Sequence, residues 1–312
     1  MRCKHLVQAT LSLTALCTLA ACGGSDGGVN SASSLSADAA SRAVADLSRS
    51  GSADTMGVTL SGTFTDPRDV PSGVAASQSS GFGSGITLSY DADTRSYTIQ
   101  LDQGGISESM TYRPQDRDTT PDRAGFIEFE RDAAGGDDTD LLLRIPGAGN
   151  SNLSHVSYGI WNRETDLPGD ADRERWAMFV FGQRTAAGDL PVSGTARYSG
   201  SVDGLWTSAT ASYRLSGSAQ LLADFGAGSV SGTLDISGRD RETGTSVAMD
   251  RLAGTAALDR AGATFAGSVT GEQGFAGNWN GAFFGPGAAE VGGTFAVTRG
   301  GEQAVGVFTA GR

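Results

Sequence analysis

Glycine content constrains the fold of this chain more than any other feature, because 46 of the 312 residues are glycine, about twice the usual share. A glycine inside a helix costs about 1 kcal/mol relative to alanine, so the composition disfavours long helices. Tight turns between short strands accept glycine readily because it adopts positive φ at little cost. The sequence therefore predicts an all-β chain with many turns.

Short stretches of alternating apolar and polar residues mark the expected strands. Residues 85–102 are typical of a hairpin with its turn at residues 91–94. Between residues 193 and 310 eight such strands follow one another, each bounded by Gly or Asp turns. Eight short strands suit a small closed barrel filled by its own side chains, and closure removes exposed sheet edges. We therefore expect a β-rich region over residues 57–190 and an eight-stranded antiparallel β-barrel over residues 191–312.

The N-terminus is typical of a secretion signal. Arg2 and Lys4 give it positive charge, and residues 6–19 form an apolar stretch too short and too polar to span a membrane. The segment Leu19–Ala20–Ala21–Cys22 resembles the bacterial lipoprotein signal, which implies cleavage before Cys22 and attachment of palmitate-type acyl chains there. The alternative is an ordinary signal peptide in which Cys22 is incidental. Residues 1–21 are thus expected to be a signal peptide, and residues 22–56, rich in Gly, Ser, Asp and Ala, a flexible lipidated tether.

Charge and the scarcity of reactive side chains limit the function. The net charge of −12 does not fit nucleic-acid binding, which needs a basic surface. All three cysteines (Cys3, Cys17 and Cys22) lie in the first 22 residues, so the body holds no disulfide and no thiolate metal site. Besides His5, His155 is the single histidine, and no nucleophile with an adjacent base is recognisable. We expect no enzymatic activity, no metal and no cofactor.

The stretch GNWNGAFFGPGAAEVGGTFAVT, residues 277–298, resembles a phosphate-binding loop in its glycine content. Such a loop is followed by a helix, whereas here a strand pattern follows, and Glu290 has no acid or base partner nearby in the sequence. The stretch is therefore expected to be a β-hairpin with its turn at residues 284–287.

This stretch, followed by the terminal AVGVFTAGR, resembles the C-terminal barrel of the transferrin-binding protein B family of surface lipoproteins. The segments FGQRTAAGDLPVSGTARYSGSVDG and LLADFGAGSVSGTLDI resemble earlier parts of that barrel, and YGIW at 158–161 resembles the region before it. The residues that carry the barrel motif are Gly277, Asn278, Trp279, Gly281, Phe283, Phe284, Gly285, Pro286, Glu290, Gly292, Gly293 and Phe295.

The resemblance implies a "handle" of antiparallel strands (57–190) packed on the barrel (191–312). It also implies a non-enzymatic outer-membrane lipoprotein, on the cell surface, that binds a protein or a haem or iron-carrier ligand through loops. An outer-membrane transporter is a further candidate partner. Unlike the larger members, this chain has one handle and one barrel. The alternative function is a structural lipoprotein that faces the periplasm and has no soluble ligand.

Three groups of residues have both a functional and a structural interpretation. Asp132, Asp137, Asp138 and Asp140 could bind calcium, but a solvated turn is favoured. His155 could ligate haem iron, but a structural or exposed histidine is favoured. The four tryptophans could anchor a protein partner, but as strand residues they are expected in the core, with Trp206 the best exposed candidate; they are Trp161, Trp176, Trp206 and Trp279.

Overall fold

The computed structural model describes residues 50–66, 69–79, 81–120, 123–133, 137–147 and 152–312. The expected signal peptide, the lipidation site Cys22 and most of the expected tether lie outside these residues. No helix in the described part of the chain is long and apolar enough to cross a membrane.

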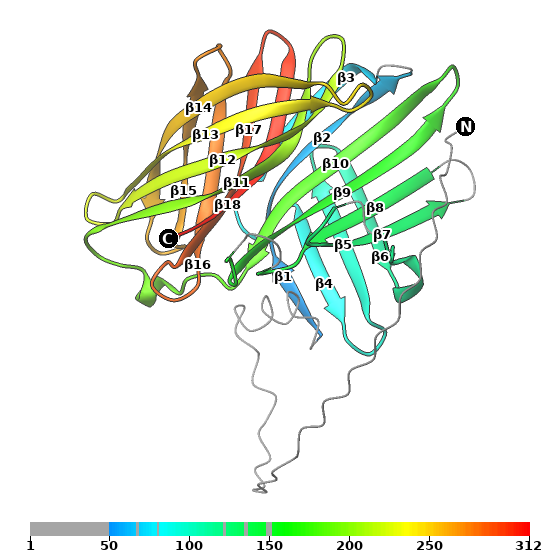
Figure 1. Cartoon of the computed structure of the whole chain (residues 1–312). Coiled ribbons are helices and arrows are strands. Elements are labelled where there is room, and N and C mark those ends of the chain that lie inside the picture. The colour runs from blue at the N-terminus through cyan, green and yellow to red at the C-terminus, as the bar shows by residue number, and fades with distance from the viewer. Residues whose placement is uncertain (1–49, 67–68, 80, 121–122, 134–136, 148–151) are drawn as a thin grey trace, which may run out of the picture. The chain divides into compact units, whose positions relative to one another are not determined.

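Ten strands form two antiparallel sheets, which together make the handle (Figure 1). The first sheet has the order β1-β4-β5-β6 and the second the order β3-β2-β10-β9-β8-β7. The strands of the first sheet are β1 (Gly51–Asp54), β4 (Ile86–Asp91), β5 (Ser96–Gln103) and β6 (Ile106–Tyr112). Those of the second are β2 (Met56–Thr65), β3 (Val70–Gln78), β7 (Phe126–Ala133), β8 (Asp137–Arg144), β9 (Val156–Leu167) and β10 (Ala171–Gly182).

The two handle sheets enclose an apolar core. Alternate residues of β4 and β5, such as Leu88 and Ile99, pack with Trp161, Phe179 and their neighbours from the second sheet, and this confirms the hairpin expected at residues 85–102. The handle begins before the expected start at residue 57, because β1 pairs with β4 and the side chains of Ala53 and Met56 are buried. Residues 51–56 therefore belong to the handle and not to the tether. The segment is too short for an alternation of apolar and polar residues to indicate a strand in the sequence.

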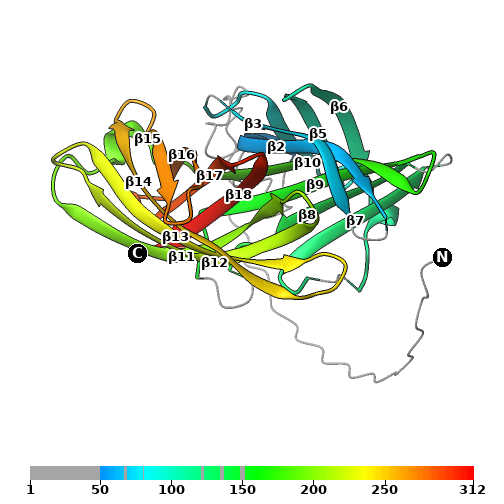
Figure 2. The ribbon, with the colours of Figure 1, turned by 90° about the horizontal axis from the view of Figure 1, so that it is seen from above.

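Eight strands form a closed antiparallel barrel, as the sequence predicted. The neighbouring strands β12, β13 and β14 of its wall are seen from above in Figure 2. The barrel strands are β11 (Thr195–Thr207), β12 (Ser212–Asp224), β13 (Ser229–Asp240), β14 (Ser246–Asp259), β15 (Thr264–Gly271), β16 (Ala276–Phe284), β17 (Glu290–Arg299) and β18 (Glu302–Gly311). Two short 3₁₀ helices are η1 (Pro114–Asp116) and η2 (Ala187–Asp189).

The second handle sheet contributes buried side chains from both of its faces. One face packs on the first sheet, and the other forms a core with outward-facing barrel residues such as Leu205, Phe284 and Val307. The barrel interior forms a separate core with Trp279, Phe283 and other inward-facing residues. Handle and barrel therefore share an apolar interface instead of being joined only by the chain.

Candidate functional site: the handle–barrel junction and the barrel wall

Glu290 of β17 fixes the start of β9. Its buried carboxylate accepts hydrogen bonds from the backbone N–H groups of Ser154 (2.7 Å), His155 (2.9 Å) and Val156 (2.8 Å). Charge-assisted hydrogen bonds of this kind are stronger than those between neutral groups. Glu290 therefore acts as a structural clamp between barrel and handle. This structural role explains why no acid or base partner lies near Glu290 in the sequence.

A second polar contact joins β3 to β16 and β17. The side-chain amide of Gln78 donates to Asn280 Oδ1 and Thr294 Oγ1, each at 3.0 Å. Thr294 Oγ1 in turn donates to Asn280 Oδ1 at 2.6 Å, and Asn280 Nδ2 donates to the carbonyl of Ser79 at 3.0 Å. Because every one of these side chains has a partner, the network satisfies polar groups that the apolar interface would otherwise leave unpaired.

The remaining residues of the barrel motif serve packing. Trp279, Phe283 and Phe295 are buried inside the barrel. A Cβ at Gly292 would lie 2.7 Å from Val156 Cγ2, and a Cβ at Gly285 would lie 2.5 Å from the His155 ring. Gly285 also has a φ of 73° at the turn after β16, a conformation that favours glycine. The motif thus holds the hairpin against the handle, and among its residues Asn278 and Pro286 are the exposed ones.

His155 lies at the same junction. Its Nδ1 is 3.0 Å from Oε1 of Gln183, and its ring packs against Gly285. These contacts account for the histidine structurally, in line with the interpretation that the sequence favoured.

Two ion-pair clusters also cross from handle to barrel. Arg241, directly after β13, binds both carboxylate oxygens of Glu174 on β10, the closer at 2.9 Å, and lies 3.2 Å from Asp69. Its guanidinium also lies over the Trp176 ring, 5.4 Å from the centroid. In the second cluster, Asp203 of β11 pairs with Arg123 and accepts a hydrogen bond from the Tyr158 hydroxyl at 3.1 Å. Burial, together with Asp203, raises the pKa of that hydroxyl.

Trp206 is not exposed, so the expectation that it is the best exposed tryptophan was wrong. Its side chain stacks on Tyr213 with the ring centroids 4.3 Å apart, and its Nε1 donates to Glu302 at 2.8 Å. The reason is alternation, since Tyr198, Val202 and Trp206 are all buried in the barrel core and β11 continues to Thr207. The other three tryptophans are buried, as expected for strand residues.

The aspartates considered for calcium lie on the β7–β8 hairpin and do not form one site. Asp137 accepts a hydrogen bond from the Thr165 hydroxyl (2.6 Å) and forms an ion pair with Arg163 (2.8 Å). These two contacts lower the pKa of Asp137. Asp138 stands opposite Asp132 across the hairpin, and burial and Asp132 raise its pKa. Burial and the neighbouring Glu130 raise the pKa of Asp140 to about 7.

An acidic strip continues from this hairpin onto β9 and β10. Carboxylate oxygens of Glu164, Asp166 and Asp172 lie within 4.8 Å of one another. Burial and the nearby carboxylates raise the pKa of Asp172. The sequence did not reveal this grouping, because it depends on the register that pairs Asp166 with Asp172.

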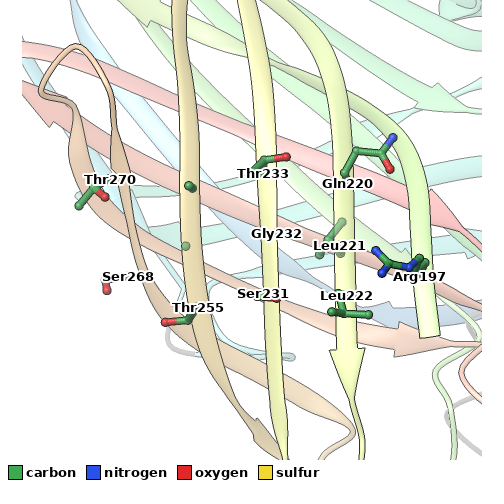
Figure 3. A pocket seen from close by; sticks show the side chains of 12 residues that line it. Arg197, Gln220, Leu221, Leu222, Ser231, Gly232, Thr233, Thr255, Ser268 and Thr270 are labelled. Carbon is green, nitrogen blue, oxygen red and sulfur yellow. The ribbon is translucent and has the colours of Figure 1, made fainter. Parts of the chain in front are cut away.

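A hollow of about 630 Å³ lies on the outer wall of the barrel (Figure 3). Two rows of side chains, each running across neighbouring strands, line it. The first row consists of Arg197, Leu222, Ser231, Thr255 and Ser268, on β11 to β15 in order. The second consists of Gln220, Thr233, Ala253 and Thr270, on β12 to β15.

Two glycines lie at the floor of the hollow. Between the two rows lies a row of inward-pointing positions, in which Gly232 is paired with Gly254. A Cβ at Gly232 would lie 3.1 Å from Trp279 Cη2, and one at Gly254 would lie 2.5 Å from Val269 Cγ1. Because these two positions carry no side chain, the wall lies directly against the barrel core there.

Comparison with known proteins identifies the barrel. Residues 190–312 match the family model for the C-lobe and N-lobe beta barrels of Tf-binding protein B. This part of the chain is therefore similar to the barrels of transferrin-binding protein B. The resemblance found in the sequence is therefore confirmed for this part of the chain, and the hairpin with Gly285 and Glu290 is part of the family barrel.

Solved structures of transferrin-binding protein B are also similar to the chain. A double mutant of transferrin-binding protein B from Haemophilus parasuis Hp5 is 15% identical to the chain. The alignment covers 83% of the present chain and 75% of the mutant's chain, with a TM-score of 0.42. The isotype 1 protein from serogroup B Neisseria meningitidis is 19% identical, with coverages of 76% and 52% and a TM-score of 0.40. The N-lobe domain of lactoferrin binding protein B from Moraxella bovis is 12% identical, with coverages of 81% and 98% and a TM-score of 0.33.

Because these identities and TM-scores are low, the solved structures add no support to the match with the family model. No curated protein matches the sequence.

Proposed function

We propose that the protein is a non-enzymatic lipoprotein of the outer membrane, anchored through Cys22 and displayed on the cell surface. It binds an extracellular protein, or a haem or iron-carrier ligand. The observation that carries this proposal is the match of residues 190–312 to the transferrin-binding protein B barrel. The lipoprotein-like signal ending in Cys22 supports it.

The junction residues are not the proposed ligand site, since Glu290, Asn280 and Arg241 are engaged in holding handle and barrel together. The barrel hairpins are joined by short connections, of which residues 241–245 and 285–289 are the longest. Longer connections occur in the handle, for example residues 113–125 between β6 and β7. Because loops on a rigid scaffold commonly carry specificity, the handle connections are the proposed contacts for a protein ligand.

The charge of the chain favours a basic partner. The net charge is −12, and the handle gathers Glu164, Asp166 and Asp172 on one surface. A negative surface attracts and orients a positively charged protein.

Protease treatment of intact cells tests the location, with a periplasmic protein as the leakage control. Loss of the protein while the control survives supports display on the surface. Digestion only after permeabilisation contradicts it and supports the alternative, a structural lipoprotein that faces the periplasm.

The ligand is then sought by pull-down from host fluids, with purified transferrin, lactoferrin and haem carriers as defined probes. Stable capture of one of these at physiological salt supports the binding function. Robust turnover in a screen of generic ester and glycoside substrates would contradict the non-enzymatic part of the proposal.

A further inference from the structure

The hollow on the barrel wall presents a set of unpaired hydroxyl groups. Within the part of the chain that the structure describes, none of the five lining Ser and Thr side chains forms a hydrogen bond. They are Ser231, Thr233, Thr255, Ser268 and Thr270. Oε1 of Gln220 accepts a hydrogen bond from the Ser199 hydroxyl at 3.0 Å. The side-chain NH₂ group of Gln220 donates to no described residue. The hollow therefore offers both donors and acceptors to a ligand.

Arg197 supplies a positive charge at one end of the first row (Figure 3). It is exposed and forms no ion pair or hydrogen bond with any residue that the structure describes. By contrast, Arg251 on the same wall lies 3.4 Å from Asp235. Among the described residues no Asp or Glu lines the hollow, although the chain contains 35 acidic residues. The wall is therefore locally suited to a carboxylate, which the planar guanidinium binds through two hydrogen bonds.

The length of the hollow indicates an elongated ligand made of several linked units and not a single small molecule. Its lining comes from the five neighbouring strands β11 to β15, and strands lie about 4.8 Å apart, so it extends over roughly 19 Å. Its hydroxyls recur along both rows, from Ser231 and Thr233 on β13 to Ser268 and Thr270 on β15. A ligand that fits carries polar groups repeatedly along its length.

Other classes of ligand fit less well. A nucleic acid needs several cations along its phosphates, whereas Arg197 is the one cationic side chain among the described residues that line the hollow. An apolar ligand would cover the hydroxyl groups of the two rows without giving them hydrogen-bond partners, which is unfavourable. A peptide strand pairs with a sheet edge, whereas each strand of the closed barrel already has two neighbours.

We propose that this hollow binds an acidic oligosaccharide whose uronic acid carboxylate pairs with Arg197 and whose hydroxyls bond to the two rows. Leu222 and Ala253 contact the C–H face of the sugar rings. This site is separate from the handle contacts proposed for a protein ligand, so either proposal can fail without the other.

Surface plasmon resonance with the full chain tests the proposal. Hyaluronan hexasaccharides, in which every second sugar is a uronate, are immobilised beside the same oligosaccharides after reduction of their carboxyl groups. We expect binding to the acidic form and at least roughly tenfold weaker binding to the reduced form, because a charge-assisted pair is lost. Arg197→Gln should weaken binding to the acidic form by a similar factor and leave the reduced form unchanged.

Matched variants separate the site from general charge attraction. Arg251→Gln removes an exposed arginine of the same wall outside the hollow and should leave binding within about twofold. Thr233→Val and Thr255→Val remove hydroxyls at nearly constant volume and should each weaken binding to both forms.

Equal losses in Arg197→Gln and Arg251→Gln would overturn the proposal, as would stronger, Arg197-independent binding to heparin. No detectable binding of the unaltered protein to the acidic hexasaccharides would also overturn it. Unchanged binding in both threonine variants would show that the hydroxyl groups of the two rows do not contact the ligand.

Discussion

Glu290 shows how one carboxylate holds two parts of the protein together. Three backbone N–H groups at the start of β9 donate to it, and a buried donor without a partner costs about 1–3 kcal/mol. We expect Glu290→Ala to lower the free energy of unfolding by about 3 kcal/mol or more, and Glu290→Gln, which keeps one acceptor oxygen, by less. Urea denaturation followed by circular dichroism measures both.

Glu272 is the control for this substitution, because it is exposed in the turn before β16 and its removal changes the net charge equally. Glu272→Ala should leave stability within about 0.5 kcal/mol. If Glu290→Ala were as mild, the carboxylate would not be the clamp described above.

Asp140 gives the handle a pH-dependent stability. The pKa of its side chain is raised to about 7 by burial and by Glu130, against about 3.9 in an unfolded chain. Between these values the folded state binds more protons than the unfolded state, so stability falls as pH rises from about 4 to about 7. Asp140→Asn should therefore stabilise the protein at pH 8, on the order of 2 kcal/mol, with no gain at pH 4.

Thermal unfolding at pH 4, 6 and 8 checks this prediction. Asp102→Asn, on the exposed side of β5, is the control for the removal of one carboxylate. A gain from Asp140→Asn that is equal at all three pH values would refute the titration argument.

At the scale of the strands, glycine sets how closely the barrel wall approaches its core. A Cβ at Gly254 would lie 2.4 Å from the carbonyl oxygen of Ser268 and 2.5 Å from Val269 Cγ1, closer than atoms can pack. Gly254→Ala should cost about 1–3 kcal/mol through overpacking. Gly188 has open space around its missing side chain, so Gly188→Ala should be neutral or stabilising by about 0.5 kcal/mol. Denaturant midpoints of the two variants compare them directly, and equal effects would refute the packing argument.

The strands could largely be predicted from the sequence, because each one depends on local alternation and on nearby turn residues. The eight barrel strands and the hairpin at residues 85–102 are examples. The roles of Glu290 and Arg197 could not be predicted in this way. Glu290 binds residues 134–136 positions away, and the hollow depends on the register that aligns Arg197 with Leu222 and Ser231. The burial of Trp206 was not predicted, because Asp203 and Gly204, which lie shortly before it within β11, are typical of a turn.

At the scale of the whole molecule, the ion pair between Arg241 and Glu174 ties the barrel to the handle. Glu174 is 2% exposed, so removal of its partner leaves a buried charge, which costs about 3–5 kcal/mol. We expect Arg241→Met to destabilise by about that amount. The double variant Arg241→Met with Glu174→Gln should recover much of the loss, because the most deeply buried carboxylate of the cluster no longer carries a charge. Asp69 also loses Arg241 but keeps the hydrogen bond from the Ser212 hydroxyl at 3.2 Å. Additive effects in this double-mutant cycle would contradict the coupling.

The shared core predicts that handle and barrel unfold together. The second handle sheet has one face in the handle core and the other against Leu205, Phe284 and Val307 of the barrel, so loss of either part exposes apolar surface of the other. Native-state hydrogen exchange with rising denaturant should give β5, β9 and β13 one common opening free energy, equal to that of global unfolding. Phe284→Ala, which creates a cavity at the interface, should lower the opening free energy of handle and barrel strands alike. If β5 opened at a markedly lower free energy than β13, the handle would instead be a separate folding unit, and the contacts of Glu290 and Arg241 would serve orientation more than stability.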